Sequence, residues 1–468
     1  MAVSAKLAVR LAGCAGAALA LASLLTVACS SRTPRPRNLL VITLDTMRAD
    51  RLPPYGFGAV AAPALDRLAA EGVLFEQAFA PVPLTLPSHA TLFTGILPPR
   101  LSVRDNVDAP LSAGFQTLAE ALHASGLTTA AFVASGVLAP GRGLDQGFGT
   151  YSLGTCKGAR RVRRPASDVA DEAIAWLVQH DSTPFFVWTH FYDTHRPYQT
   201  PYDYARGYAD PYSAAIAFED AQIARLVDYL EARTLLDDTL IAVVGDHGES
   251  LGGHGEDSHG IFIYQEALHV PLILRGPGVT PGRVSPVVRL TDVAPTILDM
   301  FGIEPPPVDG SSLTGFLDGT GEDSPREVYA ESLYPRRFGW ASLRSLRADR
   351  YKVIDAPRPE LFDLEADPFE RRNLFDSKRT VGVAMLERLR SFESAIAGGV
   401  DSPPAIDRAA AGRIASLGYV SGPAIAASAA TSEPDPKDMI AAFNELTRTQ
   451  SRAVTAEAFA RACSDESR

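Results

Sequence analysis

Two uninterrupted apolar runs, each followed directly by an aspartate, constrain the fold most strongly. Asn38–Leu44 leads into Asp45, and Thr239–Gly245 leads into Asp246. Runs of this kind are typical of strands buried on both faces, which occur in parallel sheets covered by helices. Reactive groups in such folds lie at the carboxyl ends of strands. We therefore expect an α/β fold with a mostly parallel sheet, helices on both faces and a site near the two aspartates.

Other segments alternate in the same manner between helix and strand. Helical periodicity and end signals indicate helices at 63–70, 117–124, 168–179, 213–236 and 293–301. Apolar runs indicate further strands at 128–134, 184–190 and 270–274. This alternation predicts one large α/β domain over residues 38–335.

The sequence changes in character after residue 335. Residues 340–346 and 350–355 have the pattern of a hairpin, and a helix is expected near 381–396. We therefore predict a small C-terminal antiparallel α+β subdomain over residues 336–397, attached to the larger domain.

The last part of the chain has the composition of a linker followed by a helix. Residues 398–436 are rich in Ala, Gly, Ser and Pro. In the tail at 437–468, helical spacing relates Met439, Phe443 and Leu446. A lone amphipathic helix needs a partner, so this helical tail either docks on the body or begins a further unit.

The amino terminus has the pattern of an export signal. Two cations precede an uncharged run at 11–31, in which a small residue stands before Cys29. We predict a lipoprotein signal peptide at 1–29, lipidation of Cys29 and a tether at 30–37. The alternatives are a cleaved secretory signal and an uncleaved membrane anchor. All three place the body in a bacterial cell envelope, as a membrane-anchored lipoprotein, or in the periplasmic or extracellular space.

The charge balance bears on the partners of the protein. The 468 residues include 44 Lys and Arg against 55 Asp and Glu, which gives a formal net charge of −11. Since an acidic chain repels nucleic acid at long range, we expect no nucleic-acid partner. A hydrophobic content of 46% also excludes a wholly disordered chain.

Candidate metal ligands stand at the ends of the two strands that end in aspartate. Asp246 and His247 open a long loop rich in Gly and His, and Asp45 follows the other strand. The adjacent Asp246 and His247 offer one oxygen and one nitrogen ligand, which suit a borderline divalent cation. The alternative is a solvated loop whose histidines are incidental.

A second candidate element is the segment Thr85-Leu86-Pro87-Ser88-His89 through Gly95. Pro87 is expected at the first helical position and Gly95 just past the end, which predicts a short helix with Thr85 at its mouth. A metal that lowers the pKa of the Thr85 hydroxyl would make it a nucleophile. The alternative is that Thr85 and Ser88 only cap the helix.

Three ordered motifs resemble a known family. They are Asp45-Thr46-Met47-Arg48-Ala49-Asp50, Thr85-x-Pro87-Ser88 with Gly95, and Asp246-His247-Gly248-Glu249. Weaker signals accompany them at 65–69, 264–271, 292–298 and 360–374. Over residues 38–374 this set is similar to the sulfatase branch of the alkaline phosphatase superfamily. The resemblance implies an alkaline phosphatase-like fold and a sulfatase-family hydrolase of an anionic ester.

The resemblance also implies roles for individual residues. The divalent metal (Ca, Mn, Mg or Zn) would be bound by Asp45, Thr85, Asp246 and His247, with Thr85 also the nucleophile. His195 would contact the substrate or act as acid or base, unless it is a structural histidine paired with Asp193. Further candidates for substrate binding are His89, His259 and Lys352.

This chain departs from the family at two positions that decide the chemistry. Sulfatases carry Cys or Ser in Cys/Ser-x-Pro-x-Arg, matured to formylglycine, whereas Thr85 and His89 occupy the first and last positions here. Threonine cannot be converted to that aldehyde. Thr46 stands where a second aspartate is usual, so one metal ligand is absent.

These departures leave three hypotheses. The first is a metal-dependent hydrolase or transferase that cleaves phosphate or phosphonate esters through unmodified Thr85, as threonine nucleophiles do in the phosphate branch of the superfamily. The second is a sulfuric ester hydrolase without formylglycine. The third is a catalytically inactive binding protein of the same fold.

Overall fold

A computed structural model describes residues 34–156, 159–160, 163–321, 326–397 and 433–462. The chain divides into a unit at Met1–Arg35 and a larger unit at Pro36–Arg468, and the account below concerns the larger one. The predicted signal peptide and most of the predicted linker lie outside the described residues. Within the described part of the chain, no helix is long and apolar enough to cross a membrane.

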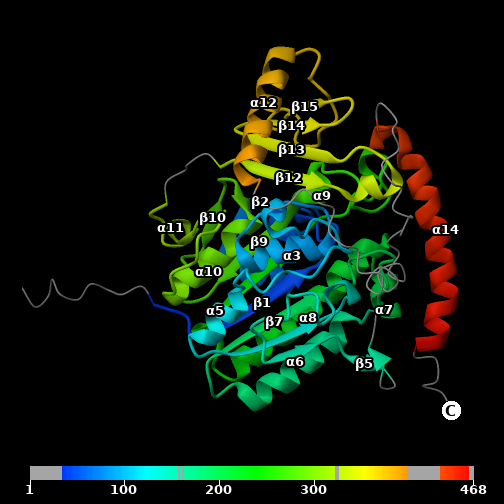
Figure 1. The fold of residues 1–468 in the computed structure, drawn as a ribbon. Coiled ribbons are helices and arrows are strands. Elements are labelled where there is room, and N and C mark those ends of the chain that lie inside the picture. The colour runs from blue at the N-terminus through cyan, green and yellow to red at the C-terminus, as the bar shows by residue number, and fades with distance from the viewer. Residues whose placement is uncertain (1–33, 157–158, 161–162, 322–325, 398–432, 463–468) are drawn as a thin grey trace, which may run out of the picture. The chain divides into compact units, whose positions relative to one another are not determined.

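The larger unit is built on a nine-stranded sheet (Figure 1). The strands are β1 (Asn38–Leu44), β2 (Val73–Phe79), β3 (Thr128–Val133), β4 (Thr150–Ser152), β7 (Phe185–Phe191), β8 (Thr239–Gly245), β9 (His269–Arg275), β10 (Gly282–Val284) and β11 (Val288–Arg289). Their order is β10-β2-β9-β8-β1-β7-β3-β4, with β11 also on β2. Strand β9 runs antiparallel to β2 and β8, and the other pairs are parallel. The predicted mostly parallel sheet is confirmed.

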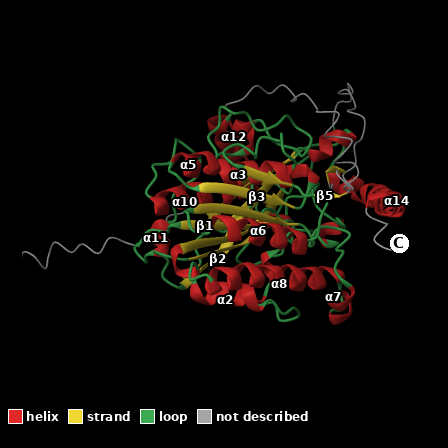
Figure 2. Ribbon diagram, turned by 90° about the horizontal axis from the view of Figure 1, so that it is seen from below, coloured by secondary structure: helices red, strands yellow, loops and turns green. Residues whose placement is uncertain are grey.

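Helices cover both faces of this sheet (Figure 2). Alternate residues of β1 show the two cores: Leu39 and Val41 join one, while Leu40 and Ile42 join the other. The first core packs against α3 (Thr85–Thr94), α5 (Leu118–Ala124) and α10 (Val293–Phe301), and the second against α2 (Pro63–Glu71), α6 (Ala166–His180) and α8 (Pro211–Ala232). Both faces of β1 are therefore apolar, which explains why its sequence shows no alternation.

A second sheet carries the C-terminal part of the domain. It is antiparallel, in the order β12 (Val328–Ser332), β13 (Leu343–Ala348), β14 (Tyr351–Asp355) and β15 (Glu360–Asp363), and α12 (Arg379–Ile396) packs on it. The predicted hairpin and helix are present. The sheet starts before the expected boundary at residue 336, because β12 pairs with β13 along its whole length.

Short elements complete the described chain. They are α4 (Pro98–Leu101), α7 (Tyr202–Gly207), α9 (Gln265–Leu268), α11 (Thr314–Leu317), the hairpin of β5 (Thr155–Cys156) with β6 (Ala159–Arg160), and 3-10 turns at Ala49–Arg51, Pro53–Tyr55, Gly136–Leu138, Leu236–Asp238, Gly253–Gly255, Leu290–Asp292 and Tyr334–Phe338.

The tail helix α14 (Pro436–Ala462) docks on the body. Phe443 is buried, with its ring 5.5 Å from Phe338, 6.0 Å from Tyr334 and 6.4 Å from Trp340, centroid to centroid. The guanidinium of Arg358 pairs with both oxygens of Asp438 at 2.8 Å. The tail was predicted either to dock on the body or to begin a further unit. The described part of the tail docks on the body.

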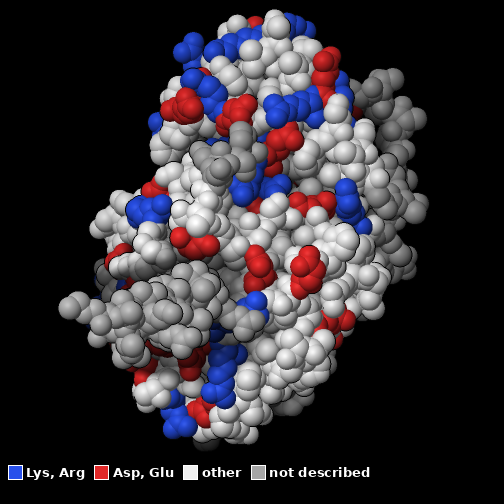
Figure 3. Space-filling view, turned by 90° about the vertical axis from the view of Figure 1, so that its left-hand side faces the viewer, with Lys and Arg blue, Asp and Glu red and all other residues white. Residues whose placement is uncertain are grey.

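Charged side chains of both signs are mixed on the face shown in Figure 3. Over α12 and the second sheet many of them are paired. Arg344 Nε lies 2.8 Å from Glu393 Oε1, for example, and so joins α12 to β13. Exposed pairs of this kind contribute little stability each, about 0–1 kcal/mol.

Candidate functional site

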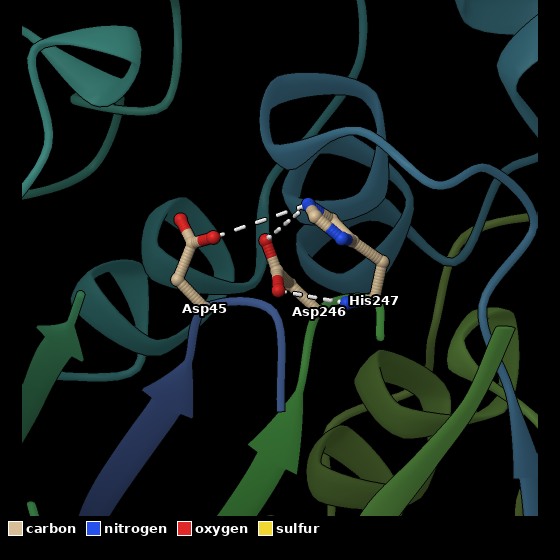
Figure 4. A group of neighbouring side chains, drawn as sticks. All are labelled: Asp45, Asp246 and His247. Atoms are coloured by element: carbon tan, nitrogen blue, oxygen red, sulfur yellow. Dashed lines mark hydrogen bonds and ion pairs between the residues drawn. The ribbon is translucent and has the colours of Figure 1, made fainter. Parts of the chain in front are cut away.

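The ends of β1 and β8 bring the two predicted aspartates together. The strands are parallel neighbours with Leu44 opposite Gly245, so the following residues emerge at the same edge of the sheet. Asp45, Asp246 and His247 each turn a ligand atom toward the others, within 4.8 Å, and all three side chains are buried (Figure 4).

The hydrogen bonds of these three residues leave metal-facing lone pairs free. Asp246 Oδ1 accepts from the His247 amide at 2.7 Å and from the Thr46 amide at 3.1 Å, whereas Oδ2 has no hydrogen-bond partner. Asp45 Oδ1 likewise has none. His247 Nδ1 donates to the Gly248 carbonyl at 2.9 Å, which leaves Nε2 as the ligand atom.

The electrostatics of the group fit a bound dication. Burial raises the pKa of Asp45 to about 7 and lifts that of Asp246 well above its ordinary value. Burial also holds the pKa of His247 well below 6.5, so its imidazole is neutral and can bind a metal. Two buried carboxylates with orphaned oxygens need a compensating charge, and a divalent cation supplies it. The residues can therefore hold one divalent metal ion.

Thr85 lies beside this group. Its Oγ1 is 3.4 Å from Asp45 Oδ2 and 3.4 Å from His247 Nε2. Helix α3 starts at Thr85 rather than at Pro87, because Leu84 is the residue that occupies the N-cap. Neither predicted cap is observed: Thr85 is the first residue inside the helix and Leu84 occupies the N-cap, while the Ser88 hydroxyl donates to the Val82 carbonyl at 3.0 Å. The Thr85 hydroxyl is thus directed at the candidate metal ligands.

His89 lies one turn after Thr85 on α3 and is fully buried. Burial lowers its pKa to about 3, so the ring is neutral. Its Nδ1 lies 2.8 Å from the Thr85 carbonyl and donates to it, and its Nε2 is 3.1 Å from Thr43 Oγ1. In this structure His89 holds the first turn of α3 in place.

His195 and His259 line the same site. The His195 ring stacks on Tyr192 with centroids 4.3 Å apart and meets the His259 ring at 5.0 Å, and His259 in turn lies 4.6 Å from the His247 ring. His195 Nδ1 donates to the Arg196 carbonyl at 2.7 Å. Asp193 accepts instead from the amide at the start of α6, at 2.8 Å, so the alternative pairing of His195 with Asp193 is not observed.

Glu249 fixes the orientation of His259. His259 Nδ1 lies 3.1 Å from Glu249 Oε1. Burial opposes protonation of this ring, but the facing carboxylate raises the pKa of His259 above its ordinary value. A histidine held in this way can donate a proton from its other nitrogen.

Lys352 lies on β14 of the second sheet and is engaged there. Its Nζ donates to the Ile263 carbonyl at 2.7 Å and is 2.7 Å from Glu370 Oε1. No described contact joins the Lys352 ammonium group to Asp45, Asp246 or His247.

Two further residues contact the site without having been predicted to do so. His190 Nε2 lies 3.2 Å from Asp45 Oδ2, because its strand β7 pairs with β1 and places His190 opposite Thr43. The Arg163 guanidinium stacks on Tyr192 at 5.2 Å from the ring centroid. Its positive charge also lowers the pKa of Asp193, although burial raises that pKa to about 7 overall. The position of His190 at a strand end could have predicted its place at the site. Arg163 belongs to no sequence motif, so nothing in the sequence indicated its place.

Comparison with known proteins decides the family. The sulfatase family matches residues 37–303, more than half of the 468, and the C-terminal part of N-sulphoglucosamine sulphohydrolase matches residues 255–394. The chain belongs to the sulfatase family. This membership confirms the prediction of a sulfatase-family ester hydrolase.

Relatives of this sulfatase-family chain include sulfatases of several kinds. Choline-sulfatase of Rhizobium meliloti is 28% identical over 450 residues, covering 76% of this chain and 86% of the relative. Arylsulfatase A of Bos taurus is 26% identical, covering 79% and 89%. The phosphonate monoester hydrolase of Agrobacterium radiobacter has the same fold, with a TM-score of 0.68 and 24% identity over 77% of this chain and 96% of that one.

Proposed function

We propose that this protein is a metal-dependent hydrolase or transferase that cleaves phosphate or phosphonate esters through unmodified Thr85. The observation that carries the proposal is the Thr85 hydroxyl, 3.4 Å from both Asp45 Oδ2 and His247 Nε2. A formylglycine hydrate can expel sulfate through its second hydroxyl, whereas a threonine adduct needs water or another acceptor to attack it. That two-step course is familiar in phosphoryl transfer.

The reaction follows from the positions of these residues. A bound dication would lower the pKa of the Thr85 hydroxyl and withdraw charge from the ester. Thr85 Oγ1 passes its proton to Asp45 Oδ2, 3.4 Å away, and forms a bond to phosphorus, while the bond from phosphorus to the alcohol oxygen breaks. His259, oriented by Glu249, or His195 donates the proton that the leaving alcohol takes up. Water, or a second alcohol in a transferase, then attacks phosphorus and gives its proton to the same histidine, while the bond from phosphorus to Thr85 Oγ1 breaks and Thr85 takes its proton back from Asp45.

The donor set favours particular metals. Two carboxylates, one imidazole and a threonine oxygen leave room for a substrate oxygen, as in catalytic zinc sites. Calcium prefers six to eight oxygen ligands and rarely takes a histidine. We therefore propose zinc or manganese as the native ion.

A second candidate is hydrolysis of sulfate esters through the same Thr85. The sequence similarity to choline-sulfatase favours it. It uses the same residues but demands that water displace sulfate from Thr85.

Assays on aryl phosphate, aryl phosphonate and aryl sulfate esters, with and without a chelator, separate these functions. Thr85→Ala should abolish turnover and Thr85→Ser should retain part of it. Thr91→Ala is the matched control, since Thr91 is also buried on α3 and its hydroxyl has no hydrogen-bond partner among the described residues. Mass spectrometry of the quenched enzyme should find a phosphoryl group on the Thr85 peptide. Sulfate release without phosphate or phosphonate turnover would refute the proposal, as would full activity of Thr85→Ala.

We also propose that the protein is anchored to a bacterial envelope membrane by lipid on Cys29. The support is the charge and apolar pattern at 1–29, which ends in a small residue before Cys29. Anchoring would place the site outside the cytoplasm, next to esters at the membrane surface.

A further inference from the structure

A cavity of about 530 Å³ lies next to the catalytic residues. It is open to solvent and is lined by residues of the loop after β7, the start of α8, the loop after β8, the tail helix α14 and the turn at Ala49–Arg51. Its charged lining consists of Arg51, Arg196, Arg448, Asp210 and Asp257. A space of this volume is large enough for a small organic ligand.

Two residues of the cavity wall form hydrogen bonds with residues of the candidate site or next to it. Arg196 directly follows His195, and its carbonyl accepts the hydrogen bond of His195 Nδ1 at 2.7 Å. The Tyr212 hydroxyl, on the opposite wall, donates to the Thr46 carbonyl at 2.7 Å, one residue beyond Asp45. These two contacts place the cavity beside the candidate site.

The two carboxylates of the lining are already engaged. Asp210 caps α8, with Oδ1 2.8 Å from the Ser213 amide and Oδ2 2.8 Å from the Ser213 hydroxyl. Asp257 Oδ2 lies 2.7 Å from a terminal nitrogen of Arg448 and 3.9 Å from Nη1 of Arg196. Two negative charges are thus satisfied by donors that the protein itself supplies.

The arginines retain unused donors. Arg196 Nη1 is buried and has no hydrogen-bond partner within the described chain. Arg51 stacks on Phe57 at 5.2 Å from the ring centroid and forms no ion pair with a described carboxylate. Three guanidinium groups against two carboxylates leave the lining with a net positive charge. Arg196 and Arg51 are partly buried and Arg448 is exposed. Guanidinium groups bind carboxylate, sulfate or phosphate through paired, charge-assisted hydrogen bonds.

The tail helix supplies part of this lining and is fixed where it does so. Asn444 Nδ2 donates to the Gly255 carbonyl at 2.7 Å, and Asn444 Oδ1 accepts from the Asp257 amide at 3.1 Å. These bonds hold α14 against the loop that follows the metal ligands and place Arg448 in the cavity wall.

We propose that this cavity binds a second anionic group, carried on the alcohol portion of the ester, and that α14 completes the cavity through Arg448. The proposal rests on the proposed function for the ester that reacts at Thr85, and it narrows the substrates to esters with two anionic groups. The same arginines would repel an alcohol portion with a quaternary ammonium group, such as choline.

Kinetics with matched substrates test the proposal on the metal-loaded full chain. Glucose 1,6-bisphosphate is compared with glucose 6-phosphate, and phenyl phosphate reports the basal reaction. The wild type should favour the bisphosphate over the monophosphate, and Arg448→Ala should lower kcat/KM for the bisphosphate about tenfold. Turnover of phenyl phosphate should change less than about twofold, because phenyl phosphate carries no second anionic group for the cavity to bind.

Arg358→Ala is the matched control. It removes the other arginine ion pair of α14, that with Asp438, without altering the cavity lining. The control should keep the preference for the bisphosphate, so a loss that it shares with Arg448→Ala would show loosening of the helix and overturn the proposal. Equal losses of Arg448→Ala on all three substrates, no preference in the wild type, or a preference for choline phosphate would overturn it as well.

Calorimetric binding of glucose 1,6-bisphosphate separates this proposal from the proposed function. Binding weakened about tenfold by Arg448→Ala, without turnover of any phosphate ester, would support the cavity and refute the phosphate-ester function. Turnover of phenyl phosphate, together with binding of glucose 1,6-bisphosphate that Arg448→Ala does not weaken, would support the phosphate-ester function and refute the anion-binding cavity.

Discussion

Replacing Asp45 by asparagine should abolish metal binding without destabilising the metal-free protein. Asp45 and Asp246 place ligand atoms within 4.8 Å of each other in a buried setting. Two carboxylates at that separation repel each other by about 3 kcal/mol at an effective dielectric constant near 20. A bound dication offsets this repulsion. Asp45→Asn removes the repulsion and one metal ligand at the same time. The variant should therefore lose the metal while its metal-free form stays as stable as metal-free wild type.

The expected shifts are measurable by scanning calorimetry and metal analysis. Metal at about 100 times its Kd stabilises the wild type by about 2.7 kcal/mol, which corresponds to about 3 °C in Tm for a chain of this length. A chelator should abolish this shift in the wild type and have no effect on Asp45→Asn. Turnover of the variant should fall by about 10³-fold, since several kcal/mol of charge stabilisation is lost.

Asp220→Asn is the control for removing a buried carboxylate elsewhere. Asp220 accepts from the Leu65 amide at 2.8 Å and the Ala64 amide at 3.1 Å, away from the metal ligands. This variant should keep its metal and its response to chelator. If Asp45→Asn retained a full metal complement, or if its Tm still fell with chelator, the assignment of Asp45 as a ligand would be refuted.

Four further predictions follow from individual contacts. His89→Ala should lower kcat more than it raises KM, because it frees the Thr85 carbonyl, and steady-state kinetics on phenyl phosphate test this. Burial raises the pKa of Asp220 to about 6, so the folded state favours the protonated carboxyl and the protein loses stability as the pH rises. The free energy of unfolding, measured in urea, should fall by about 1.4 kcal/mol between pH 5 and 8. Asp220→Asn should not show this loss. Phe443→Ala should destabilise the docked tail by about 3 kcal/mol, seen as faster hydrogen exchange in α14. Cys29→Ser should release the protein from the membrane fraction on cell lysis, and continued sedimentation with membranes would contradict a lipid anchor.

The main sheet could be predicted from the sequence because its inner strands are apolar on both faces. Residues 239–245 form β8 with no error at either end. Strand β2 was not predicted, since Glu76 and Gln77 interrupt its apolar run at a bulge between Phe75 and Ala78. The reversed direction of β9 was equally hidden, because a buried strand has the same composition whichever way it runs.

Site residues that stand at strand ends could be predicted from the sequence. Site contacts that depend on tertiary packing could not. The apolar runs predicted that Asp45 and Asp246 each follow a buried strand, and the structure adds that the two strands are parallel neighbours. No sequence pattern could show that His89 bonds back to Thr85, or that Lys352 pairs with Glu370. These contacts depend on side-chain directions and on pairing within the second sheet.

The departures from the sulfatase pattern are connected in space. Thr46 replaces an acidic residue; its hydroxyl donates to the Thr194 carbonyl at 2.7 Å while its amide supports Asp246. His89 replaces the arginine of the motif, is neutral, and supports Thr85. Relative to the pattern that the resemblance implies, the two departures remove one negative and one positive charge. Both replacing residues are fixed by hydrogen bonds to residues around Thr85. This support around Thr85 is a reason to prefer our proposal of a threonine nucleophile to the hypothesis of an inactive binding protein, and the Thr85→Ala assay decides between them.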